Sequence, residues 1–267
     1  MKYKNVFLWV MAVILTLTIS IYQRITGPTK PVRGKVSIND KTINYKLLRT
    51  EVSGTDAQIK FETKDEKIGG ALIYKRYKSY DAWDTLALEH IEGFLTASIP
   101  TQPAAGKVMY RIVLTDQNNS TYPLTEEPVV IRFKGDVPAF YLIPHIIFMF
   151  TSLLLAFRSL IQSIFVRESF YYPTLLTFIA LVLGGLIFGP IVQKYAFGAY
   201  WTGFPFGHDL TDNKTAISVI FWGIALYTAV CKRKSTRWWV LAAAIVLLAT
   251  YLIPHSVLGS ELDYTKI

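Results

Sequence analysis

Apolar residues in this chain are gathered into long runs, and this restricts the fold more than any other feature. The runs occupy residues 6–22, 139–157, 173–192, 216–230 and 238–258. A helix needs about 20 apolar residues to cross a hydrocarbon core roughly 30 Å thick. The sequence therefore predicts five membrane-spanning helices. The first is expected to be an uncleaved anchor, and the alternative is a signal sequence that is removed.

Basic residues indicate how these segments cross the membrane. The segments 1–5, 158–172 and 231–237 hold eight of the 28 Lys and Arg residues but one of the 19 Asp and Glu residues. Short cytoplasmic loops are enriched in Lys and Arg. We therefore expect a multi-pass protein of the cytoplasmic (inner) membrane with its N-terminus inside and its C-terminus in the periplasm or extracellular space. The same bias accounts for most of the net charge of +9, and no basic stripe suits a nucleic acid.

Residues 30–136 follow a different pattern, which begins after a linker rich in Gly and Pro. Apolar and polar side chains alternate in several segments, with turn-forming residues between them. The expected inward faces are Ile43, Tyr45 and Leu47; Ala57, Ile59, Phe61 and Thr63; Val108, Tyr110, Ile112 and Leu114; and Val129, Ile131 and Phe133. Alternation over a segment of roughly 100 residues predicts an antiparallel β-sandwich on the outer side of the membrane.

Short stretches of this segment also have a familiar arrangement. They are 71–77 (ALIYKRY), Trp83, 93–100 (GFLTASIP) and 103–116 (PAAGKVMYRIVLTD). Together they resemble the fibronectin type III and immunoglobulin-like modules of bacterial surface proteins. The resemblance implies an Ig-like sandwich over about residues 33–135, and such modules usually bind a partner or act as spacers. The membrane half resembles uncharacterised bacterial integral membrane proteins, which implies no activity.

The predicted fold class is thus an α+β membrane protein with three parts. They are a transmembrane anchor with its linker (1–29), an exoplasmic β-sandwich (30–136) and a bundle of four transmembrane helices (137–267) that includes an outer aromatic loop (193–215). Gly185 and Gly189 form a pair of small residues that predicts close helix packing.

Ionisable residues on the predicted outer side are the candidates for chemistry. They are His145, His208, Asp209, Asp212 and His255. An ionisable group inside a span is costly and by default indicates function. Imidazoles and carboxylates suit a transition metal, and two membrane histidines could ligate a haem. The alternative is structural: the repeated pentapeptide YLIPH at 141–145 and 251–255 suits the membrane interface, and Thr211 or Asp212 would serve as a helix N-cap.

Two functions from different classes remain open. The first is a non-enzymatic subunit or interaction protein, which contacts membrane lipid and, through its β-domain, a protein partner. The second is a membrane enzyme or redox protein with a metal or haem at the outer-face residues. A transporter is disfavoured because the later spans carry almost no charge in their middles. Cys231 is the single cysteine, which excludes an intramolecular disulfide and a Cys-based zinc site.

Overall fold

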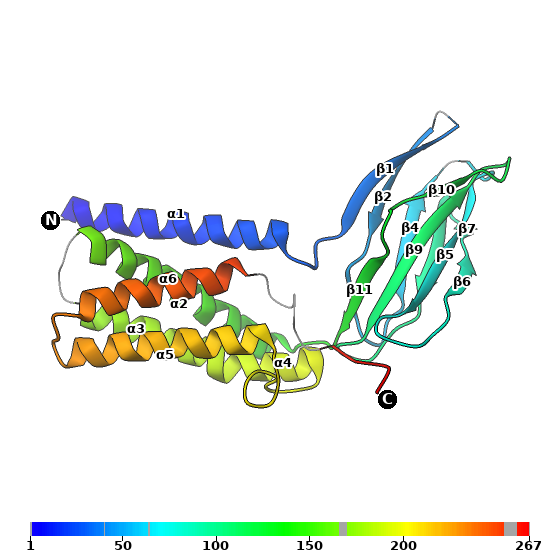
Figure 1. Ribbon diagram of the computed structural model, residues 1–267. Coiled ribbons are helices and arrows are strands. Elements are labelled where there is room, and N and C mark those ends of the chain that lie inside the picture. Colours follow the sequence, from blue (N-terminus) through cyan, green and yellow to red (C-terminus); the bar gives the residue numbers. More distant parts are fainter. Residues whose placement is uncertain (1, 40, 64, 166–169, 254–260, 267) are drawn as a thin grey trace. The chain divides into compact units, whose positions relative to one another are not determined.

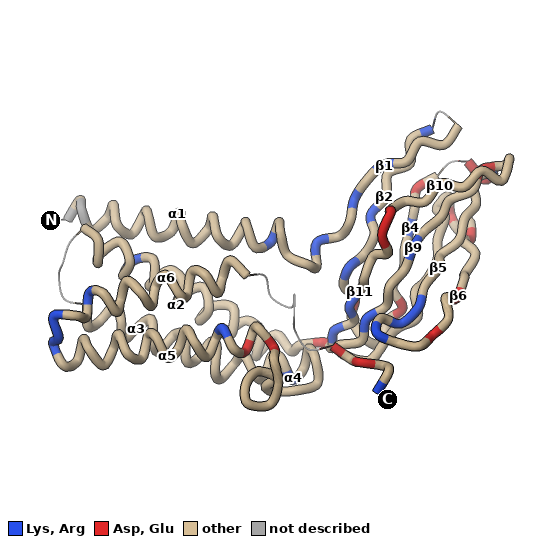
Figure 2. The backbone as a smooth tube through the Cα atoms, viewed as in Figure 1, with Lys and Arg blue, Asp and Glu red and all other residues tan. Residues whose placement is uncertain are grey.

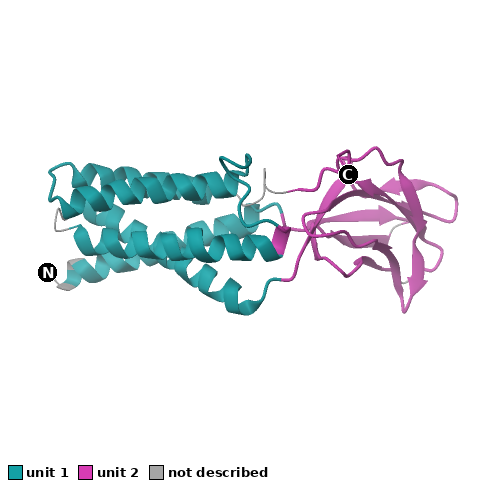
Figure 3. Ribbon diagram, turned by 90° about the horizontal axis from the view of Figure 1, so that it is seen from below, with its two compact units in different colours: residues 1–28, 137–195, 199–260 teal, residues 29–136, 196–198, 261–267 magenta. Residues whose placement is uncertain are grey.

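The computed structural model describes residues 2–39, 41–63, 65–165, 170–253 and 261–266 (Figure 1). The chain is an α+β protein and divides into two compact units (Figure 3). The helical unit contains residues 1–28, 137–195 and 199–260, and the strand unit contains residues 29–136, 196–198 and 261–267. Two short segments that the sequence analysis assigned to the helical part, 196–198 and 261–267, therefore belong with the strands.

The described part of the helical unit contains α-helices and one π-helix. Their bounds are α1 Lys2–Thr26, α2 Ala139–Phe165, α3 Tyr171–Leu181, η1 Val182–Phe188, α4 Gly189–Phe197, α5 Leu210–Val230 and α6 Thr236–Leu252. The α3, η1 and α4 segments follow one another without a break. They form one continuous helical segment in which the π-helix is an internal widening.

Four of these helical segments are long and apolar enough to cross a membrane. They are Asn5–Thr26, Ala139–Phe165, Tyr171–Phe197 and Leu210–Val230, with 22, 27, 27 and 21 residues. This finding indicates a multi-pass membrane protein. The fifth predicted span corresponds to α6, which is apolar but has 17 residues in the described part of the chain.

The helical unit packs around one buried cluster, to which α1, α2, α3, α5 and α6 contribute. Trp222 of α5 is fully buried in this cluster. Two hydrogen bonds tie α6 to its neighbours. The Tyr251 hydroxyl donates to the carbonyl of Met149 in α2 at 2.8 Å, and the Gln23 amide of α1 donates to the carbonyl of Tyr251. These contacts integrate α6 into the bundle.

The strand unit contains short strands in three sheets. Their bounds are β1 Val32–Ile38, β2 Lys41–Leu47, β3 Thr50–Val52, β4 Ala57–Glu62, β5 Gly69–Arg76, β6 Asp84–Ala87, β7 Glu89–Ile91, β8 Phe94–Ile99, β9 Lys107–Thr115, β10 Thr121–Pro123 and β11 Val129–Lys134. β1 and β2 form a hairpin, β4, β8 and β7 form a second sheet, and the largest has the order β3-β11-β9-β5-β6 with β10 also on β9. All described pairings are antiparallel except that of β11 with β3.

One hydrophobic core receives side chains from all three sheets. The four alternating faces expected from the sequence are confirmed: every residue predicted to point inward is buried, except Tyr45, which is half-buried. Tyr110 is fully buried, and its hydroxyl donates to the carbonyl of Leu48 at 2.8 Å. Burial raises the pKa of Tyr110. The phenol therefore stays neutral, with its polar tip satisfied inside the core.

Candidate functional site

The loop that joins α4 to α5, residues 198–209, is held to the first turn of α5 by Asp212. The Asp212 carboxylate accepts hydrogen bonds from the backbone N–H groups of Thr202 at 2.6 Å and Gly203 at 2.9 Å. It also accepts one from the side-chain amide of Gln193 at 3.0 Å. A side chain at position 203 would overlap Asp212, so glycine is needed there. Asp212 is 5% exposed, and its buried carboxylate is satisfied by these donors.

Asp209 provides the N-cap of α5. One of its carboxylate oxygens accepts from the backbone N–H of Thr211 at 2.7 Å, and the other accepts from the Thr202 hydroxyl at 3.1 Å. The expectation of a cap at Thr211 or Asp212 is therefore wrong. The helix begins earlier than the apolar run suggests, because polar residues occupy its first turn while the loop packs against them.

The outward side chains of this loop are aromatic. Asn213 accepts a hydrogen bond from the backbone N–H of Phe204 at 2.7 Å, which fixes the tip of the loop. Tyr200, Phe204 and Phe206 are 59%, 79% and 82% exposed. His208 is also exposed, and no hydrogen bond joins its ring to another described residue. The loop thus combines a fixed backbone with freely accessible aromatic side chains.

Lys214, in the first turn of α5, was not identified from the sequence. It is 7% exposed, and its ammonium group donates to the carbonyl of Ile253 at 2.7 Å, where α6 ends. The last carbonyls of a helix lack partners within the helix, and a cation is favourable there. Lys214 therefore ties the start of α5 to the end of α6. A lysine just before an apolar run was the signal that could have indicated it.

His145 lies beside the π-helix. Its Nδ1 is 2.9 Å from the carbonyl oxygen of Gly184, within η1. The same carbonyl accepts the backbone N–H of Gly189, a spacing typical of a π-helix. Of the predicted small-residue pair, Gly189 lies against the His145 ring and Gly185 lies against Thr215 of α5. The two glycines thus face two different helices.

The structure brings together only part of the predicted outer-face cluster. Asp209 and Asp212 both accept from the hydroxyl of one threonine, at 3.1 and 3.3 Å. His208 directly precedes Asp209 in the chain but is exposed, and the His145 ring is hydrogen-bonded to Gly184 of η1. Among the described residues, no three His, Cys, Asp or Glu side chains are placed to hold a metal ion. His255 lies outside the described residues, so the metal or haem site stays a prediction.

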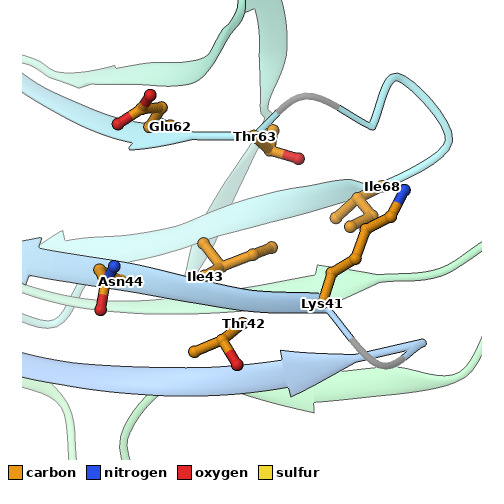
Figure 4. Close-up of a pocket in the computed structure, with 7 residues that line it drawn as sticks. All are labelled: Lys41, Thr42, Ile43, Asn44, Glu62, Thr63 and Ile68. Atoms are coloured by element: carbon orange, nitrogen blue, oxygen red, sulfur yellow. The ribbon is translucent and has the colours of Figure 1, made fainter.

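A separate pocket of about 420 Å³ opens in the strand unit between β2 and β4 (Figure 4). Its lining residues are Lys41, Thr42, Ile43, Asn44, Glu62, Thr63 and Ile68. Lys41 forms an ion pair with Asp65 at 2.8 Å, and this hydrogen bond holds the pKa of Asp65 below its usual range. Of the predicted outer-face residues that the structure describes, none lines this pocket.

The C-terminal tail docks within the strand unit through Glu261. The Glu261 carboxylate accepts hydrogen bonds from Lys107 and Lys78, and the backbone N–H of Leu262 donates to the carbonyl of Ala105 at 3.2 Å. Burial alone would raise the pKa of Glu261, but the two lysines more than offset this, and its pKa is lowered. Burial lowers the pKa of Lys107 in spite of its acidic partner.

Tyr264 extends the same docking contact. Its hydroxyl donates to the side chain of Gln102 at 2.9 Å, and the Arg76 guanidinium lies 4.6 Å from the centre of its ring. A side chain at Gly106 would overlap the Tyr264 hydroxyl. The tail is therefore seated by an ion pair, a backbone hydrogen bond and an aromatic contact.

Comparison with known proteins adds nothing to this geometry. No protein-family model matches the chain, and a search of curated proteins finds no match. The function is therefore inferred from the arrangement of the residues.

Proposed function

We propose that this chain is a non-enzymatic, membrane-anchored interaction protein. Five helices cross the cytoplasmic membrane, the N-terminus lies inside, and the strand unit forms an Ig-like β-sandwich outside. A partner protein binds on the outer side through the strand unit, and the exposed aromatic side chains of the outer loop offer a further binding surface. Membrane lipid surrounds the helical unit.

The observation that carries this proposal is the hydrogen-bond network of the outer loop. Two buried carboxylates, Asp209 and Asp212, are used to fix its backbone, while Phe204 and Phe206 remain exposed. Aromatic side chains dominate the energetics of many interfaces. A backbone that is already ordered loses less conformational freedom on binding. A fixed loop with outward aromatic residues therefore has the properties expected of a binding surface.

The docked tail supports a fifth crossing. After the strand segment 29–136, the chain passes through three segments that meet the criteria for a span, and it ends in residues 261–267 of the same unit. Three crossings alone would leave that tail on the opposite side from the strands. If α6 also crosses, the tail returns to the strand side. Its 17 residues extend about 26 Å, near the lower limit for a span.

Two further features support the rest of the topology and the sandwich. The connection between α5 and α6 contains Lys232, Arg233 and Lys234, and Arg237 lies in the first turn of α6, as expected near a cytoplasmic loop. In the strand unit, sheets with alternating burial share a single core, which is how two packed sheets bury their inner faces. An Ig-like sandwich of this size is a common binding module.

A membrane enzyme or redox protein is the second candidate, and one observation favours it. The Nδ1 of His145 faces the Gly184 carbonyl, and a metal-ligating histidine commonly directs its other ring nitrogen to such an acceptor. A π-helix also often marks a functional site. Metal analysis and the haem absorption spectrum of the full chain, purified in detergent, test this candidate. Stoichiometric metal or haem that is lost in His145→Ala would favour the enzyme over the interaction protein.

Photo-crosslinking in intact membranes tests the interaction function. A photoreactive residue at position 206 should give a discrete protein adduct, which mass spectrometry identifies. Asp212→Asn keeps the side-chain size but removes the charge that holds the loop, so it should lower the yield of this adduct. A probe at Tyr80, which is 88% exposed in the strand unit, serves as the control for general surface reactivity. Adducts with lipid alone at position 206 would overturn the proposal.

A further inference from the structure

The β1–β2 hairpin has a one-sided basic face. Outward side chains alternate with inward ones on both strands, and three of the outward ones are Arg33, Lys35 and Lys46. Neither strand contains an acidic residue, and Asp40, between the two strands, is the first acidic residue of the chain. Figure 2 shows the basic residues spaced along the hairpin.

The pairing register makes this face unfavourable in isolation. Arg33 lies directly opposite Lys46, and like charges opposite each other destabilise a sheet. Both side chains are exposed, and neither has an ion-pair partner among the residues that the structure describes. Lys41, in contrast, is neutralised by Asp65. An anion from outside the chain would relieve the repulsion between these two side chains.

The chain keeps this repulsive pair close to the bilayer. β1 begins at Val32, and only residues 27–31 separate it from the end of α1 at Thr26. A path of that length spans at most about 20 Å. Arg24, in the last turn of α1, and Lys30 add two exposed basic residues on the way. Basic residues near a bilayer are attracted to anionic headgroups within a Debye length of about 8 Å.

We infer that Arg33, Lys35 and Lys46, the basic hairpin face, bind the anionic phospholipid headgroups of the membrane from which α1 emerges. This contact is distinct from the partner contact of the outer loop and does not depend on it. An edge strand can also carry Lys or Arg simply to prevent pairing with another chain. That explanation makes a different prediction, since it requires no lipid.

The experiment uses the full chain in nanodiscs and a fluorophore on the hairpin. The label is placed at Asn44→Cys, which is exposed between the basic residues, in a Cys231→Ser background. Nanodiscs contain phosphatidylcholine alone or an equimolar mixture with phosphatidylglycerol, each doped with a lipid that carries a nitroxide on its headgroup. Arg33→Gln with Lys46→Gln is the test variant. Arg111→Gln, which removes an exposed arginine from β9, is the matched control.

Quenching by the headgroup nitroxide should be several-fold stronger in discs that contain phosphatidylglycerol, and raised salt should reverse the difference. The double variant should lose the difference, and the Arg111 variant should keep it. Inorganic phosphate added to phosphatidylcholine discs should not reproduce it, which separates a lipid surface from a free anion. Equal quenching in both lipids would overturn the inference. So would self-association of the double variant without any lipid dependence, which would assign the charges to edge protection.

Discussion

Glu261→Gln should loosen the C-terminal tail from the strand unit. The substitution keeps the side-chain size and removes the charge that pairs with Lys107 and Lys78. A hydrogen bond to a charged group contributes roughly 1.5–3 kcal/mol, against about 0.5–1.5 kcal/mol for a neutral one. The Lys78 side chain is 48% exposed, so its pair adds little. Lys107 is 13% exposed, so its pair accounts for most of the loss, about 1.4 kcal/mol or a tenfold change.

Hydrogen exchange in the full chain measures this effect at one atom. The backbone N–H of Leu262 donates to Ala105, so it is protected only while the tail is docked. We expect its exchange to become about tenfold faster in Glu261→Gln. Asp263→Asn is the matched control, because the partners of Asp263 are Thr265 and Lys266 in the tail itself. In Asp263→Asn the Leu262 N–H should exchange at the same rate as in the unsubstituted chain.

Equal exchange rates in the two variants would refute the assignment of the ion pair as the main contact. The remaining contact of Tyr264 with Gln102 and Arg76 would then have to hold the tail by itself. Fast exchange of the Leu262 N–H in the unsubstituted chain would mean that the tail is not docked. The argument from the tail to a fifth crossing would be lost with it.

Three further predictions concern pH, topology and the hairpin. The pKa of Glu261 is lowered in the folded chain. Glu261 therefore stabilises the docked tail above the ordinary carboxyl pKa, and this stabilisation is lost as the pH falls through the lowered value. The protection of the Leu262 N–H from exchange, measured against pH, should be lost over the same range. Reporters fused after Cys231 and after Ile267 should show a cytoplasmic and an external location, and a cytoplasmic location for both would contradict five crossings. Gly34→Ala would place a Cβ into the Tyr45 ring, so thermal melting should show a loss of about 1–3 kcal/mol.

The inward-facing residues of the strand unit could be predicted well from the sequence. Its inward residues alternate over whole strands, for example from Val108 to Leu114, and period-two burial depends only on the local backbone. The sheet order could not be predicted in the same way. β3 pairs with β11 in parallel, across almost the whole length of the unit, and no local pattern encodes that partner. The Ig-like description likewise stays a proposal.

The site around Asp209 and Asp212 was predicted in composition but not in arrangement. The sequence identified Asp209 and Asp212 as unusual, but their roles depend on Thr202, which lies ten residues before Asp212 and reaches it only through the fold of the loop. The docking of Glu261 on Lys107 joins residues 154 positions apart. Periodicity and capping rules describe neighbours along the chain, so they cannot predict contacts between residues far apart in the sequence.

Ionisable residues in the helical unit show why a charge within a span is an incomplete signal of function. Lys214 of α5 donates to the carbonyl of Ile253, directly after α6, and Arg158 of α2 donates to Gln162 and to Asn5 of α1. Each group joins two helical segments: Lys214 lies in the first turn of α5, and Arg158 lies seven residues before the end of α2. Burial there is offset by direct hydrogen bonds. These two ionisable groups thus hold helical segments together, and the exposed aromatic loop and the basic hairpin face remain the proposed binding surfaces.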